Sequence, residues 1–76
     1  MSISRAKKDK LKSLGKRVKA VRKSNDLTLK ELAHSIDKDP QSVHRLEMGE
    51  VNPSYLYLLE ICEGLKIKIE DLLMDL

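Results

Sequence analysis

Three helix-start signals divide the middle of this chain into short segments. Thr28 and Glu31 form a capping box, in which the threonine hydroxyl and the glutamate carboxylate can satisfy opposing backbone amides. Asp39-Pro40 is a second signal, because the carboxylate can cap free amides and the proline ring fits the first helical turn. Asn52-Pro53-Ser54 is a third. Starts this close together leave room only for short helices in this part of the chain.

Apolar periodicity predicts five helices. Within each segment the apolar residues recur at spacings of three and four, the pattern of an amphipathic helix, and no segment shows the alternation typical of a strand. We therefore expect an all-α fold, a compact domain of five helices. The predicted helices span about residues 8–24, 28–37 and 40–48, then a stretch from the third start signal to a break at Gly64 and Ile67, and finally 69–76.

Size and composition exclude several functions. A chain of 76 residues buries roughly 60% of the surface that it exposes when unfolded, enough for a thin core but not for a deep catalytic cavity. Cys62 has no partner for a disulfide, and together with His34 and His44 it cannot supply a structural zinc set. No apolar run approaches the ~20 residues that span a bilayer. We expect no enzyme activity, no catalytic residue, no metal and no cofactor, and a location in the cytoplasm.

The charge is divided unevenly along the chain. Residues 1–25 hold ten basic residues and one acidic residue, whereas residues 26–76 hold five basic and eleven acidic ones. Such a basic segment can attract a phosphate polyanion or an anionic membrane, or it can be only a solvated helix face. A membrane is disfavoured because the apolar face of the first helix lacks Trp and Phe and is needed to close the core.

The first ten residues form a basic segment separate from the predicted domain. Residues 1–10 could be an arm that touches DNA, an extension of the first helix, or a disordered stretch, and we expect disorder or fraying. Residues 11–76 are the predicted folded domain.

Two of the predicted helices are placed as in a DNA-binding helix-turn-helix. About three residues, 37–39, separate them, and the second helix is short, capped and polar on its outer faces. The residues around them are more specific: LTLKELA at 27–33, VHRLEMG at 43–49, NPS at 52–54 and LLEIC at 58–62. Over about residues 11–74 the sequence resembles the Cro and lambda-repressor-like (XRE-like) family of five-helix transcriptional regulators.

The resemblance implies that the helix of about residues 40–48 lies in the major groove of double-stranded DNA. Glutamine can pair bidentately with adenine and arginine with guanine, each worth ~1–3 kcal/mol of discrimination, whereas serine is more permissive. The implied base-contacting residues are Pro40, Gln41, Ser42 and Arg45.

Attraction to the DNA backbone is expected from cationic and polar side chains around that helix. Those that we expect to lie near phosphates are Arg17, Arg22, Lys30 and His44. The resemblance also implies that Arg22 forms a partly buried structural ion pair with Glu47. The alternative is an exposed ion pair, worth ~0–1 kcal/mol.

Five positions depart from the family pattern. Leu29 replaces a glutamine that commonly reaches a phosphate, Asp37 stands where the turn usually has glycine, and Lys38 takes a usually apolar place. Met48 and Glu50 stand where basic or polar residues often help to hold phosphate. These departures lower the affinity that we expect for DNA. They keep a second hypothesis open, an antitoxin-like or adaptor protein-interaction module with weak or nonspecific DNA binding and a protein partner.

The principal expectation is a sequence-specific, repressor-like transcriptional regulator that binds double-stranded DNA as a homodimer. One helix of this size reads only a few base pairs, so such proteins pair two half-sites about one helical turn apart. Surplus apolar residues near the C-terminus either form the dimer contact or only finish the core. They are Ile67, Ile69, Leu73, Met74 and Leu76, with Tyr55 or Tyr57.

Overall fold

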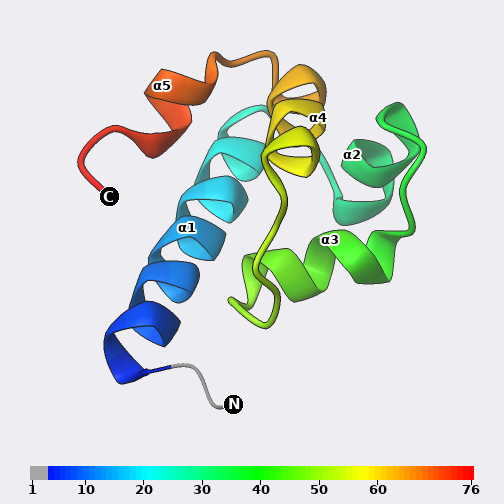
Figure 1. The fold of residues 1–76 in the computed structure, drawn as a ribbon. Helices are drawn as coiled ribbons and strands as arrows, with labels where there is room; N and C mark the ends of the chain where they lie inside the picture. The colour runs from blue at the N-terminus through cyan, green and yellow to red at the C-terminus, as the bar shows by residue number, and fades with distance from the viewer. Residues whose placement is uncertain (1–3) are drawn as a thin grey trace.

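The computed structural model describes residues 4–76, which form five helices and, within that range, no strand (Figure 1). The all-α, five-helix architecture predicted from the sequence is confirmed. The helices are α1 (Arg5–Ser24), α2 (Leu29–Ser35), α3 (Pro40–Glu47), α4 (Tyr55–Leu65) and α5 (Ile69–Leu73).

The helices pack as a small globule around α3 and α4. α3 lies against both α1 and α2, while α4 packs against α2 and α5, and α5 returns to contact α1 (Figure 1). Each helix contributes at least one side chain with no exposed surface, so a single core joins all five. These side chains are Val18, Leu32, Val43, Ile61 and Leu72.

The start signals in the sequence act as helix caps in the structure. Thr28 Oγ1 accepts a hydrogen bond from the amide of Glu31 at 3.0 Å, and Glu31 Oε1 accepts one from the amide of Thr28 at 2.9 Å. The side chain of Asp39 accepts from the amide of Gln41 at 2.9 Å. Ser54 caps α4 in the same way. Local chemistry therefore sets where three of the helices begin.

α1 begins earlier than the sequence predicted. Ser4 is its N-cap, and its hydroxyl accepts a hydrogen bond from the amide of Lys7 at 3.3 Å. Residues 5–10, which we expected to be disordered or frayed, are helical and exposed. The rest of the predicted N-terminal segment, residues 1–3, lies outside the described residues.

The α4–α5 region differs in two further ways. Gly64 does not break the helix but lies inside α4, where a Cβ would stand 2.6 Å from Leu32 Cδ1 on α2. The helix ends at Leu65, between the two residues of the predicted break, and Lys66 takes a left-handed conformation with φ 57°. α5 is shorter than predicted and ends at Leu73. None of the helices in the described part of the chain is both long and apolar enough to cross a membrane.

Candidate nucleic-acid interface

The turn between α2 and α3 is closed by backbone hydrogen bonds. Asp37, which stands in place of the usual glycine, adopts a left-handed conformation with φ 56°. This is one of the few non-glycine residue types that tolerate that region. The amide of Lys38 then donates to the carbonyl of Ala33 at 2.8 Å, and Asp39 caps the next helix. The turn therefore accommodates aspartate in place of glycine, and α3 begins directly after it at Pro40.

α3 is anchored by few side chains and exposes polar ones. Val43 and Leu46 are buried in the core, whereas Gln41, His44 and Arg45 are exposed. A short helix with a narrow buried face and hydrogen-bonding groups outward is suited to lie in a groove of DNA.

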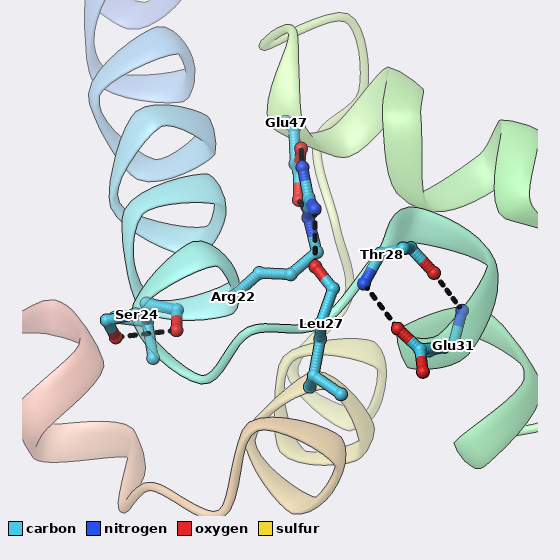
Figure 2. A network of polar contacts seen from close by, with 7 residues as sticks. Arg22, Ser24, Leu27, Thr28, Glu31 and Glu47 are labelled. Atoms are coloured by element: carbon cyan, nitrogen blue, oxygen red, sulfur yellow. Dashed lines mark hydrogen bonds and ion pairs between the residues drawn. The ribbon is translucent and has the colours of Figure 1, made fainter.

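Arg22 and Glu47 hold α3 against α1 (Figure 2). The guanidinium donates from Nε to Oε2 of Glu47 at 2.7 Å and from Nη2 to Oε1 at 3.1 Å. Its Nη1 donates to the carbonyl of Leu27 at 2.7 Å, in the segment that leads into α2. The side chains are 8% and 2% exposed, so the pair is buried, as the family resemblance implied. All three guanidinium nitrogens of Arg22 have hydrogen-bond partners within the fold, and its expected contact with a DNA backbone stays a prediction.

Gly15 lets α1 and α3 approach closely, a feature that sequence reasoning missed. A Cβ at this position would meet the backbone carbonyl of Glu47 and would stand 2.6 Å from that of Leu46. Because these are backbone atoms, no side-chain rotation could relieve the overlap. The only sequence signal was a glycine inside a helix. Such a glycine lowers stability by about 0.5–1 kcal/mol relative to alanine, so its presence there indicates a packing requirement.

The side chain of Ser42 contacts a residue of α4. Its Oγ lies 2.9 Å from Oη of Tyr57, and both residues are partly buried. The ammonium of Lys38 lies 5.5 Å from the centre of the Tyr57 ring and 3.4 Å from Oε1 of Glu60. The tyrosine thus links the start of α3 and the turn before it to α4, which sequence reasoning did not foresee.

The expected base-reading residues lie around one end of α3, with differing access. Gln41, Ser42 and Arg45 line one shallow hollow together with Asp39 and Val51. Pro40 occupies the first helical position and is partly buried. The side chain of Arg45 is half exposed, and its Nε lies 3.7 Å from Oε1 of Glu50. Of the four residues, Gln41 and Arg45 are the exposed ones, and both side chains have bidentate hydrogen-bonding chemistry.

The expected backbone-contacting residues come from three helices, α1, α2 and α3. Nη1 of Arg17 donates to the carbonyl of Leu72 at 3.1 Å and lies 3.4 Å from that of Asp71, so this side chain fastens α5 to α1. Lys30, in the first turn of α2, and His44 on α3 are exposed. Arg17 thus has a structural contact within the fold, and its expected contact with a phosphate stays a prediction.

A capped turn between two short helices, with the second held firmly and polar outward, defines a helix-turn-helix DNA-binding domain. The model of the helix-turn-helix family matches residues 18–72 of this sequence. The chain belongs to this family, in its XRE-like, Cro and lambda-repressor-like branch, and it is a DNA-binding transcription regulator rather than an enzyme. No curated protein matches the sequence.

Solved structures of two regulators share the fold. The restriction-modification controller protein C.AhdI from Aeromonas hydrophila is 26% identical, with a TM-score of 0.82 over 84% of this chain and 97% of that one. The clp gene regulator ClgR from Corynebacterium glutamicum is 28% identical, with a TM-score of 0.80 over 83% of this chain and 82% of its own. A second ClgR structure gives the same score and is covered over 67% of its length.

Proposed function

We propose that the protein recognises a specific double-stranded DNA sequence by placing α3 in the major groove, where Gln41 and Arg45 read base edges. The observation that carries this proposal is the fixed orientation of α3: its inner side is held by the buried pair of Arg22 and Glu47, while Gln41 and Arg45 stay exposed. Rigid placement matters because a bidentate contact between a side chain and a base needs defined geometry. Pro40 adds an apolar surface beside them.

Ser42 has a narrower role in this proposal than the sequence alone implied. Its hydroxyl already has a partner in Tyr57, so a contact with a base would require sharing or breaking that hydrogen bond. We assign the residue to the orientation of α3. Lys30 and His44 remain the proposed contacts to phosphates from α2 and α3, because both are exposed and neither is in a salt bridge among the described residues.

The proposed assembly is a homodimer formed through α4 and α5. Apolar side chains are exposed there and would be covered in a symmetric contact. Tyr57 is excluded from this surface because it packs toward α3, and Ile67 and Ile69 are partly buried against the core. The exposed candidates are Tyr55, Leu56, Leu73, Met74 and Leu76, between 40% and 69% exposed.

Repression is the mode of regulation that this arrangement supports most simply. A dimer that occupies two half-sites can block access to the same DNA without contacting any other protein. Activation would require a surface for a further protein partner in addition to the dimer contact. We therefore propose a repressor-like regulator.

Selection of duplexes from a randomised library at ~150 mM salt tests the proposal, because nonspecific attraction is already weakened there. We expect an enriched inverted repeat with half-sites about 10 base pairs apart. Arg45→Ala should relax the preference at one base position by ~1–3 kcal/mol, whereas Lys66→Gln, an exposed lysine beyond α4, should leave it unchanged. Absence of any enriched sequence would contradict sequence-specific recognition.

The same apolar surface favours a second candidate, an antitoxin-like or adaptor module that binds another protein. The carboxylate of Glu50 beside Arg45 supports it, since that carboxylate opposes a phosphate at the same place. Light scattering separates the two candidates. A dimer that becomes monomeric in Leu56→Glu supports the homodimer, while a monomeric wild type without sequence preference for DNA supports the second candidate.

A further inference from the structure

One side of α1 carries a continuous row of cations. Six basic residues recur every three or four positions along the helix, which places them on one face. All six are exposed, and none takes part in a salt bridge among the described residues. This basic stripe consists of Arg5, Lys8, Lys12, Lys16, Lys19 and Lys23.

The N-terminal half of the stripe lies beside the loop that follows α3. A Cβ on Gly49 would stand 2.8 Å from Cα of Lys12, so the loop touches α1 at this point. Lys8 and Lys12 line a shallow hollow together with residues 48–52 of the loop. In Figure 1 the N-terminal half of α1 continues past the end of α3. From Gly15 to Arg5 that extension is about 15 Å long, at 1.5 Å per residue.

The helix gains no stability from cations at this end. Positive charges near a helix N-terminus oppose the helix dipole, and the first turn of α1 holds no acidic residue. Nor does the core require this part of the helix, because residues 5–10 are all exposed. Yet the helix is continuous and holds Arg5 and Lys8 on the side of the α3–α4 loop. An anionic partner that meets both the loop and the helix accounts for this arrangement.

We propose that Arg5, Lys8 and Lys12 bind the phosphate backbone of the same DNA whose major groove receives α3. The inference rests on the proposed function. A helix that lies in the groove, about 12 Å wide, is flanked by a phosphate backbone on each side. In this arrangement the loop that follows α3 would lie over one of these backbones, and the side chains beside the loop would face the same strand. Arg17 and Arg22 are engaged inside the fold, whereas Arg5, Lys8 and Lys12 in the N-terminal half of the stripe are exposed.

Two double variants with equal charge change test the assignment. Lys8→Gln/Lys12→Gln removes two cations beside the loop, and Lys19→Gln/Lys23→Gln removes two from the same stripe at the same spacing but farther along α1. Binding to the selected duplex is measured as a function of salt. For Lys8→Gln/Lys12→Gln we expect the slope of log K against log salt, which is negative, to become shallower by about 0.9 for each phosphate that the protein no longer neutralises. Affinity at ~150 mM salt should drop by roughly fivefold for each such phosphate, with the sequence preference unchanged.

The control variant should keep a nearly normal slope. Equal reductions in both double variants would mean diffuse attraction by net charge and would overturn the assignment, as would a normal slope in Lys8→Gln/Lys12→Gln. Binding of vesicles rich in anionic lipid by the wild type, abolished in that variant while its DNA slope stays normal, would assign the stripe to a membrane instead. If the wild type binds no duplex selectively, the proposed function itself is contradicted, and the assignment of these lysines falls with it. Thermal unfolding verifies that each variant is folded.

Discussion

Arg22 and Glu47 join α1 to the last turn of α3 through two parallel hydrogen bonds between guanidinium and carboxylate. A two-point contact fixes orientation as well as distance. Because Arg45 lies only two positions before Glu47, the pair also limits how α3 can turn about its own axis. The third hydrogen bond, to the carbonyl of Leu27, extends this restraint to the segment that enters α2. Arg22 of α1 therefore restrains both helices of the helix-turn-helix.

Removing one partner of this pair should destabilise the protein strongly. Glu47→Gln leaves a buried guanidinium without its counterion, and we expect a loss of about 3 kcal/mol in the free energy of unfolding, measured by urea denaturation. Arg22→Met/Glu47→Leu should recover a large part of that loss, since it leaves no unpaired charge.

The matched control is the other ion pair of α3. Arg45 and Glu50 lie 3.7 Å apart with side chains 55% and 56% exposed, so Arg45→Met should change stability by less than about 0.5 kcal/mol. Similar losses in Glu47→Gln and Arg45→Met would contradict the structural role of the buried pair.

Gly15→Ala should reduce stability, although alanine is the better helix former. The added methyl group would meet backbone carbonyls of α3 and would force the two helices apart, at a cost of about 1–3 kcal/mol in unfolding free energy. Gly64→Ala is the comparison, because its nearest contacts are side-chain atoms of Leu32 and Ile36 rather than backbone atoms. A larger loss in Gly64→Ala than in Gly15→Ala would mean that the α1–α3 contact can yield.

Local signals in the sequence predicted the features that depend on neighbouring residues. The capping box of Thr28 and Glu31, the Asp39 cap and the end of α3 near Met48 all involve atoms a few positions apart, so spacing is enough to locate them. Burial of Val43 and Leu46 likewise follows from helical periodicity.

Features that depend on distant segments were beyond this reasoning. The residues next to Arg17 in the sequence do not indicate whether its side chain contacts a phosphate or the carbonyl of Leu72. The contact with Leu72 depends on how α5 packs against α1. The hydrogen bond of Ser42 joins residues fifteen positions apart on different helices. For the start of α1, an extension of the first helix was one of the alternatives, and the basic first turn, which opposes the helix dipole, gives no local reason to prefer it.

The hydrogen bond between Ser42 and Tyr57 should couple the two residues in DNA binding. If it orients α3, Ser42→Ala and Tyr57→Phe should weaken binding to the selected duplex by similar factors, about 1 kcal/mol each, with the double variant little worse than either. Titration of the four proteins with one duplex measures the coupling. Additive losses, with a change of base preference only in Ser42→Ala, would instead mean that the serine reads a base.

Glu50→Gln should strengthen DNA binding. The carboxylate lies 3.7 Å from Nε of Arg45, so it attracts a guanidinium that the proposed recognition needs, and it repels nearby phosphates. We expect tighter binding to the selected duplex, with the gain growing as the salt concentration falls. Glu63→Gln, an exposed glutamate on α4, provides the same change in net charge away from α3. Equal gains in DNA affinity in both variants would mean that the gain comes from net charge and not from the contact between Glu50 and Arg45.

The capping box should make stability depend on acidity. Hydrogen bonds from the backbone amide and then the side chain of Thr28 lower the pKa of Glu31 from its ordinary value of 4.5. A carboxyl whose pKa is lower in the folded state stabilises the fold fully above pH 4.5, and this contribution is lost as the pH falls through the folded-state pKa. Glu31→Gln keeps an acceptor at the same place but does not titrate. The urea midpoint of the wild type should therefore exceed that of Glu31→Gln at pH 7, and the difference should shrink progressively below pH 4.5. A difference that stays constant from pH 7 to about pH 2 would show that the charge of Glu31 does not stabilise the start of α2.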